Sequence, residues 1–157
     1  MVSDYVELHC HSAFSFLDGA SSPLELATEA IELGHEALAL TDHDGLWGSM
    51  EFATACRAVG LRAITGAELT VSMDPSGTEL RHLTILVESS IGYRNLCSLI
   101  TEAHAGTRDG PDRRAGTPSI PLESLEGRIA GLVCLTGCAG RGPIASAWEG
   151  GRPESGR

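Results

Sequence analysis

The chain has 157 residues, and its 21 acidic and 11 basic side chains give a formal net charge of −10. This charge argues against non-specific binding to nucleic acid or to anionic membranes through a basic surface. Every basic residue is an arginine, which excludes Schiff-base or phosphate-loop chemistry on a lysine, and no apolar run approaches the roughly 20 residues of a membrane span.

The first predicted elements are a short strand and a helix. Residues 6–9 are expected to form the strand. Ser22 is expected to begin the helix, because serine at the N-cap, Pro23 at the first position and Glu25 at the third form a capping sequence. Gly34 is expected to end it.

The remaining elements continue this alternation of strands and helices. An apolar strand at 37–41 without polar alternation is typical of a strand covered on both faces. The later elements are expected to be a helix at 49–59 ended by Gly60, a strand at 61–65, two extended arms at 68–73 and 80–87 around a turn at 74–77, a helix at 91–104 and a buried strand at 131–135. The alternation indicates an α/β fold with a parallel sheet or barrel.

Two segments are expected to lie outside this ordered part. Residues 106–118 are rich in glycine and charge, which is typical of a mobile surface loop, and residues 150–157 are expected to be a disordered tail. The five cysteines are odd in number and irregularly spaced, which indicates reduced thiols. Because residues 1–7 also lack the pattern of a signal peptide, we expect a cytoplasmic protein without membrane attachment.

Polar side chains follow three successive predicted strands. His9 and His11 come at the first, Asp42 and His43 at the second, and Glu68 at the third. Each feature alone has an ordinary explanation: surface or core histidines, an acidic turn that caps the next helix, a solvated glutamate. The carboxyl ends of parallel strands meet at one edge of a sheet, however, and imidazoles with carboxylates are ligands for zinc, manganese or iron. Together these residues predict a metal site.

Four further residues bear on this site. If the turn at 74–77 joins a hairpin, His82 faces Leu69 and lies within reach of Glu68, although a half-buried strand histidine is an equal alternative. Asp18 lies before a glycine in the loop after the first strand, and Cys138 follows the last predicted strand. By spacing alone, a turn aspartate and an inert buried cysteine are the simpler interpretations of these two residues. Asp44 alone is interpreted as a helix-capping turn residue.

These motifs, in this order, resemble the PHP (polymerase and histidinol phosphatase) family, and most of all the PHP domain of C-family bacterial DNA polymerases of the polymerase III alpha type, error-prone branch. The resemblance covers about residues 5–149. The matching segments are LHCHS at 8–12, FLDGA at 16–20, LALTDH at 38–43, GAE at 66–68, RHLTIL at 81–86, GYRNLCSLI at 92–100 and LTGC at 135–138.

The resemblance implies a distorted (βα)₇ TIM-like barrel with up to three divalent metal ions in its mouth. The ligands that it implies are His9, His11, Asp18, His43, Glu68, His82 and Cys138. Asp42 matches no ligand position and is interpreted as a residue that orients a ligand. The implied chemistry is phosphoester hydrolysis, with a role in 3′–5′ exonuclease action during DNA replication or repair. Its implied partners are a DNA 3′ end or another phosphoester and the rest of a polymerase chain.

The sequence also departs from the family pattern. The family has an Asp-x-His pair on a late strand, and no such pair follows Cys138. A complete barrel needs roughly 250 residues. We therefore expect an incomplete PHP domain at 1–149, truncated before the last strands of the barrel, with an exposed sheet edge and weak or no activity. Two alternatives remain open: a non-catalytic structural module, and a free-standing phosphoesterase of the histidinol phosphatase type.

Overall fold

The computed structural model describes residues 5–105, 107, 116–137 and 141–144. Most of the predicted loop at 106–118, the predicted tail at 150–157 and Cys138 therefore lie outside the described residues. The elements, in chain order, are α1 (Pro23–Glu32), β1 (Ala37–Leu40), α2 (Ser49–Val59), β2 (Arg62–Ser72), β3 (Leu80–Val87), α3 (Ser90–Ala105), β4 (Ile120–Pro121), the 3₁₀ helix η1 (Leu122–Leu125) and β5 (Leu132–Cys134).

The strands form a mixed sheet. β1 and β4 pair with β2 in parallel, whereas β2 with β3 and β3 with β5 are antiparallel. The prediction of an α/β fold is confirmed, but the prediction of a parallel sheet is wrong for half of these pairings. The short turn between β2 and β3 makes that pair antiparallel, because parallel strands need a long crossover. Over the described residues the sheet is open, so the barrel remains a prediction.

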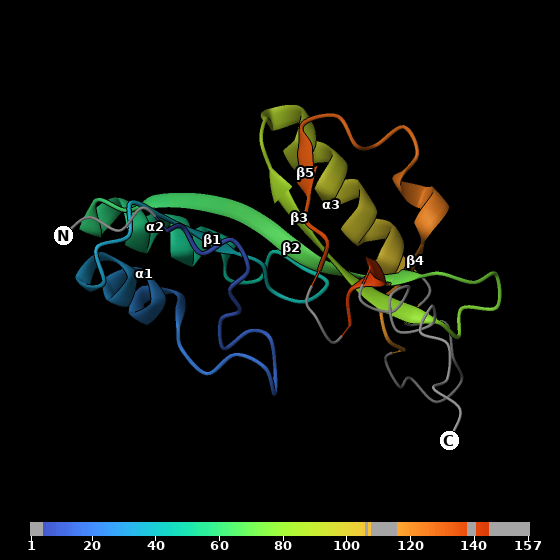
Figure 1. The fold of residues 1–157 in the computed structure, drawn as a ribbon, viewed down its shortest axis with the longest axis horizontal. Helices are drawn as coiled ribbons and strands as arrows, with labels where there is room; N and C mark the ends of the chain where they lie inside the picture. Colours follow the sequence, from blue (N-terminus) through green and yellow to red (C-terminus); the bar gives the residue numbers. More distant parts are fainter. Residues whose placement is uncertain (1–4, 106, 108–115, 138–140, 145–157) are drawn as a thin grey trace, which may run out of the picture.

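β2 is the longest strand and joins the two ends of the molecule (Figure 1). The predicted strand at 61–65 and the predicted arm at 68–73 are parts of this single strand. Gly66 separates them in the sequence, but it continues the strand and lies close to β3: a Cβ atom there would be 2.6 Å from the carbonyl oxygen of Ile85. The glycine therefore marks close packing of two backbones and not a break.

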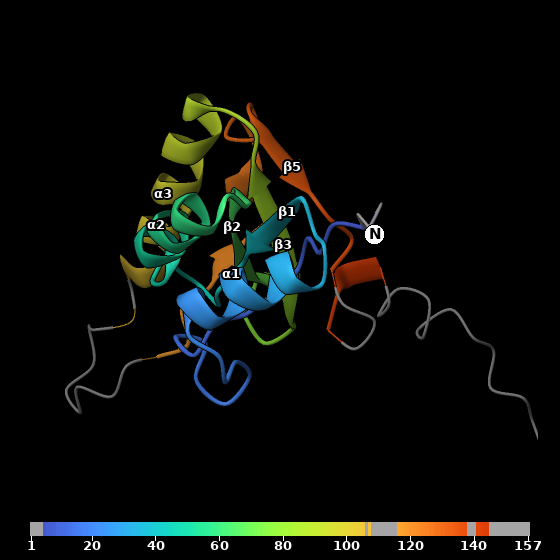
Figure 2. The same ribbon diagram turned by 90° about the vertical axis from the view of Figure 1, so that its left-hand side faces the viewer.

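The apolar residues form two cores, one at each end of β2. The first packs α1 and α2 on β1, with Phe52 and Leu40 almost fully buried. The second packs α3 on β2 and β3, around Leu69 and Leu96. Figures 1 and 2 show α1 and α2 grouped with β1, and α3 beside β3 and β5. Along β2, the first core extends to Ala63 and the second begins at Ala67, next to Glu68.

The predicted helix ends are confirmed. Ser22 and Glu25 form a reciprocal capping box at the start of α1. Gly60 ends α2 with a left-handed backbone, φ 79°.

None of the described helices is long and apolar enough to span a membrane.

Two predicted strands differ in the structure. The segment predicted at 6–9 runs beside β1 with a single parallel bridge, between Glu7 and Leu38, and is not a regular strand. β5 was expected to be buried, but Val133 and Cys134 are exposed. Its only described strand neighbour is β3, and only α3 packs near it, so β5 lies at the edge of the described sheet.

Candidate metal centre

One buried carboxylate, that of Glu68, lies at the centre of the candidate site. Its side chain is 3% exposed. Oε2 contacts Nε2 of His9 and lies 3.9 Å from Nε2 of His11. Oε1 lies 2.5 Å from Nδ1 of His82 and 3.3 Å from Nδ1 of His43. The two oxygens therefore face two different pairs of imidazoles.

The sheet brings these five residues together. His9 and His11 lie on the segment beside β1, which Thr41 fixes by donating its backbone N–H to the carbonyl of Cys10 at 2.8 Å. His43 follows β1 and forms a parallel bridge with Glu68 of β2. His82 comes from β3. The structure thus brings the four histidines and Glu68 together, and that they bind metal stays a prediction.

The register of the hairpin differs from the predicted one by one residue. His82 pairs with Thr70 and not with Leu69. Because side chains alternate between the two faces of a strand, this difference decides which face His82 occupies. The observed register puts His82 on the same face of the sheet as Glu68. The two side chains therefore meet because they share a face, and not only because they lie close along the hairpin.

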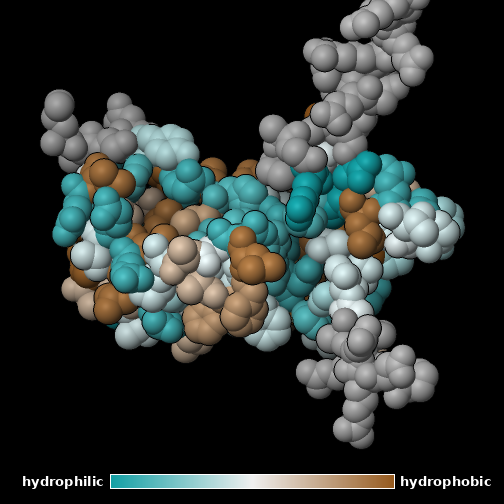
Figure 3. Space-filling view, turned by 90° about the horizontal axis from the view of Figure 1, so that it is seen from below, coloured by the Kyte–Doolittle hydropathy of each residue, from teal (hydrophilic) through white to brown (hydrophobic). Residues whose placement is uncertain are grey.

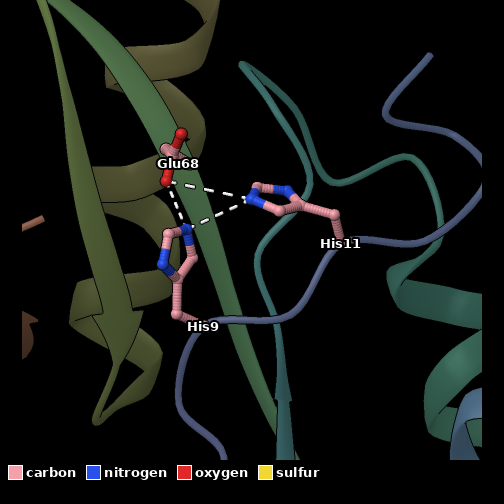
Figure 4. Close-up of side chains that lie close together, drawn as sticks. All are labelled: His9, His11 and Glu68. Atoms are coloured by element: carbon pink, nitrogen blue, oxygen red, sulfur yellow. Dashed lines mark hydrogen bonds and ion pairs between the residues drawn. The ribbon is translucent and has the colours of Figure 1, made fainter. Parts of the chain in front are cut away.

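The imidazole rings are packed against one another. Nε2 of His9 and Nε2 of His11 lie 3.1 Å apart, and both rings point toward the carboxylate, as Figure 4 shows. The rings of His11 and His43 stack with centroids 4.4 Å apart, and those of His43 and His82 meet edge to face at 5.1 Å. All four rings are therefore in one contiguous cluster.

The donor atoms of this cluster fit metal binding. Two triads, one of His9, His11 and Glu68 and the other of His43, Glu68 and His82, each have three possible ligand atoms within 4.8 Å of one another. Two nitrogens on one tetrahedral zinc ion, at about 2.0–2.1 Å from it, lie roughly 3.3 Å apart. The 3.1 Å between the nitrogens of His9 and His11 is close to this value. The mixture of imidazole and carboxylate suits zinc, manganese or iron.

The electrostatics of the cluster depend on Glu68. Burial by itself would raise the pKa of its carboxyl group, but hydrogen bonds from His82 and His9 outweigh burial and hold that pKa well below its ordinary value. The same hydrogen bond raises the pKa of His9. Burial, together with the neighbouring His43, lowers the pKa of His11, which favours the neutral imidazole that binds metal.

Asp18 extends the cluster toward solvent. Its Oδ2 lies 2.8 Å from Nε2 of His43, and its side chain is 54% exposed. The hydrogen bond to His43 is the first cause of a lowered pKa at Asp18, with a smaller contribution from the positive charge of Arg141. The backbone carbonyl of Arg141 accepts from the N–H of His82 at 2.9 Å, which places this arginine at the rim of the cluster. Cys138, the remaining predicted ligand, lies outside the described residues.

Asp42 is buried beside the cluster and does not point into it. Its carboxylate accepts the backbone N–H of Ser12 at 2.8 Å, the Ser12 hydroxyl at 2.9 Å and the Ser15 hydroxyl at 2.8 Å. Ser15 Oγ in turn lies 3.4 Å from Nδ1 of His11 and accepts the backbone N–H of His43 at 3.1 Å. Asp42 therefore acts on the histidines through Ser15, which the sequence did not single out.

Asp44 has a different role from the predicted one. The interpretation as a helix cap is wrong, because the N-cap of α2 is Gly48 and no side chain caps this helix. The carboxylate of Asp44 instead accepts the N–H and the hydroxyl of Thr70, at 2.7 and 2.9 Å. Its left-handed backbone, φ 47°, turns the chain between His43 and the next helix. Asp44 thus fastens the loop of His43 to β2.

The comparison with protein families agrees with this geometry. The model of the PHP domain matches residues 7–156. The chain belongs to the PHP domain family. Its relatives include proteins named error-prone DNA polymerase from Cutibacterium acnes, 43% identical over 87% of this chain, and from Mycolicibacterium paratuberculosis, 42% identical over 96%. A DNA polymerase III subunit alpha from Treponema pallidum is 38% identical over 85%. The chain spans 12–14% of the length of these curated relatives.

Two solved structures also resemble the fold. A protein from Chromobacterium violaceum described as an amidohydrolase is 31% identical, with a TM-score of 0.52 over 64% of this chain and 34% of its own. A candidate metal-dependent phosphoesterase from Bifidobacterium adolescentis is 28% identical, with a TM-score of 0.51 over 65% of this chain and 34% of its own. The chain therefore matches about a third of each of these larger structures.

Proposed function

We propose that this chain is the metal-dependent phosphoesterase module of an error-prone C-family DNA polymerase, and that it hydrolyses phosphodiesters at DNA 3′ ends during replication or repair in the cytoplasm. The observation that carries the proposal is the sharing of one buried carboxylate, Glu68, between two pairs of imidazoles. The relatives named as polymerases support the polymerase context. The neighbour described as a candidate phosphoesterase supports the reaction class.

The residues that would hold the metal divide between the two oxygens of Glu68. His9 and His11 serve Oε2, and His43 and His82 serve Oε1. Asp18 adds a carboxylate on the far side of His43. Cys138 remains a ligand predicted from the family resemblance alone. The bound metal would supply positive charge to the phosphoester and lower the pKa of a water molecule that it binds.

The chain's own residues set the conditions for this chemistry. Glu68 is ionised by its histidine partners and so brings a negative charge into a buried place that attracts cations. Asp42, through Ser15, holds the ring of His11 and the backbone of His43 in position before any ligand arrives. In the overall reaction, the oxygen of water bonds to phosphorus, and the alcohol oxygen leaves with a proton.

The negative charge of the chain favours a role for bound metal in substrate binding. At a net charge of −10, the protein repels a phosphodiester unless cations compensate locally. Arg141, exposed at the rim of the cluster, is the positive side chain that we expect to meet the substrate phosphate. This arginine would position the phosphate and would not replace the metal.

The test is hydrolysis by the chain after it has been loaded with zinc or manganese. A 3′-labelled DNA strand and a small phosphomonoester are compared as substrates, with Glu68→Gln as the variant. We expect weak release of 3′ nucleotides from DNA by the loaded protein, as for an incomplete domain, and no release by the variant. Activity confined to the phosphomonoester would favour a free-standing phosphatase. A metal-loaded protein that hydrolyses neither substrate would favour a structural module.

A further inference from the structure

A cavity of about 500 Å³ lies against the metal cluster, on the outer side of His43. Its walls come from three parts of the chain that are distant in sequence: the loop after His11, the loop after β1, and the end of α3 with the segment that follows it. The lining residues are Phe14, Ser15, Phe16, His43, Asp44, Trp47, His104 and Pro118. Only His43 belongs to both the cavity and the cluster.

The walls of this cavity are aromatic and exposed. The side chains of Phe14, Phe16 and Trp47 are 41%, 86% and 55% exposed. Phe14 and Phe16 lie on the long loop that precedes α1 and projects from the body in Figure 1, whereas Trp47 lies between β1 and α2. Hydrophobic surface gathers on the face of the molecule that Figure 3 shows. Exposed aromatic side chains grouped around a hollow are typical of a binding site.

The aromatic walls are held in place relative to the cluster. The indole N–H of Trp47 donates to the carbonyl of His43 at 3.1 Å. The rings of Trp47 and His104 meet edge to face at 5.7 Å, and His104 Nε2 lies 2.7 Å from the carbonyl oxygen of Asp44. The Trp47 ring is therefore tied at two points to the residues that follow β1, one of which is His43.

The chemistry of the walls restricts the occupant. None of the described residues that line the cavity is a lysine or arginine, and the carboxylate of Asp44 is occupied by Thr70. The cavity thus offers flat apolar faces for a ring, and at His43 a polar side chain that also belongs to the cluster. A molecule that matches both features has an aromatic ring joined through a short link to a phosphate.

We propose that this cavity stacks the base of the nucleotide whose phosphoester is placed at the metal cluster. The proposal rests on the proposed function and narrows its substrate to nucleotide esters, because a small aliphatic phosphate would leave the aromatic walls unused. Stacking on aromatic side chains tolerates every base. We therefore expect little preference among the four bases. A free nucleotide and the end of a DNA strand both carry a base next to a phosphoester, so either could occupy the cavity and the cluster together.

The test measures binding through the fluorescence of Trp47. A Trp148→Phe background leaves Trp47 as the single tryptophan. The metal-loaded protein is titrated with deoxyadenosine monophosphate and with deoxyribose 5-phosphate, and then with two DNA strands, one ending in a normal nucleotide and one ending in an abasic sugar. We expect the probes that carry a base to quench the fluorescence and to bind at least about fivefold more tightly than their matched probes. If the base tightens binding of the free nucleotide alone, the site is assigned to free nucleotides. If the base tightens binding of the DNA strand, the site is assigned to DNA ends.

The matched variants are Phe16→Ala and Leu17→Ala. Both side chains are highly exposed in the same loop, but only Phe16 lines the cavity. We expect Phe16→Ala to weaken binding of the base-carrying probes at least about fivefold and to leave deoxyribose 5-phosphate unaffected, whereas Leu17→Ala changes neither. Equal affinity for matched probes, or no effect of Phe16→Ala, would overturn the proposal.

Titration of the metal-free protein with deoxyadenosine, which has no phosphate, separates this proposal from the proposed function. Quenching by deoxyadenosine without hydrolysis of any phosphoester would retain the base site and refute the phosphoesterase. Hydrolysis of DNA ends without any effect of the base on binding would retain the phosphoesterase and refute the base site.

Discussion

Asp42 shows how a residue next to the ligands can shape the site without touching a ligand side chain. Its carboxylate is 2% exposed and accepts hydrogen bonds from Ser12 and Ser15, which fix the start of the loop that carries Asp18. Gly19 closes this loop so tightly that a Cβ atom there would lie 1.9 Å from the carbonyl oxygen of Ser12. The loop conformation therefore depends on one buried charge and one glycine.

Replacement of Asp42 by asparagine tests this dependence. The amide would turn an N–H₂ group toward hydrogen-bond donors, so we expect Asp42→Asn to lower the free energy of unfolding by about 2–3 kcal/mol. Glu29→Gln, an exposed change of the same kind on α1, is the control and is expected to change it by less than about 0.5 kcal/mol. Urea unfolding of the metal-free proteins measures both. Equal stability of the two variants would show that Asp42 does not organise the loop.

Cys10 lies between His9 and His11 but points away from them. It packs against the core of α1, β1 and α2, as the alternation of side chains along an extended segment predicted. Burial, helped by the negative charges of Glu7 and Asp42, raises the pKa of its thiol from 9.0 to about 11. A higher thiol pKa means a smaller thiolate fraction at any pH below it, and the thiolate is the reactive form.

We therefore expect slow alkylation of Cys10 in the folded protein. At pH 8 the shift from 9.0 to about 11 lowers the thiolate fraction roughly 100-fold relative to the unfolded chain, and the labelling rate should rise with pH until about 11. Peptide mass spectrometry after timed alkylation, with and without urea, measures this difference. Rapid labelling of Cys10 at pH 8 in folded protein would contradict its placement in the core.

At the scale of elements, the helix ends were predictable because they depend on local sequence. Gly60 ends α2 with φ 79°, and a Cβ atom there would meet nothing within 4 Å. The cost of a substitution at this position is therefore a cost of backbone conformation alone.

We expect Gly60→Ala to lower the free energy of unfolding by about 1 kcal/mol, and Gly60→Asn to lower it less, because asparagine tolerates the left-handed region. Thermal or urea unfolding of both variants tests this order, and equal stability of Gly60→Ala and the wild type would contradict it.

The strand pairings were less predictable than the helix ends. The extent of β2 and the antiparallel pairing of β3 depend on contacts between residues that are distant in sequence. Gly66 is an example, since its role becomes apparent only when β3 lies against it. The register of His82 is another, because an error of one residue in the turn moves the side chain to the opposite face.

At the scale of the whole molecule, the residues of the candidate site were predictable but their supports were not. His9, His11, His43 and Glu68 lie at the ends of successive apolar segments, so sequence order alone indicated that they meet. Ser15 and Thr70 are supports that the sequence does not distinguish from other small polar residues. The aromatic cavity is formed by three segments that are distant in sequence, so no single stretch of the sequence indicates it.

The most direct test of the central claim, that Glu68 and four histidines bind metal, is the metal content of the chain. The protein is stripped with chelator, reloaded with zinc or manganese, and measured by elemental analysis beside a His9→Ala/His11→Ala variant, with folding of both checked by circular dichroism. Because the two imidazole pairs share Glu68, we predict at least one ion per chain in the wild type and fewer in the variant. Folded wild-type protein that retains no metal, or a variant that retains as much as the wild type, would contradict the claim.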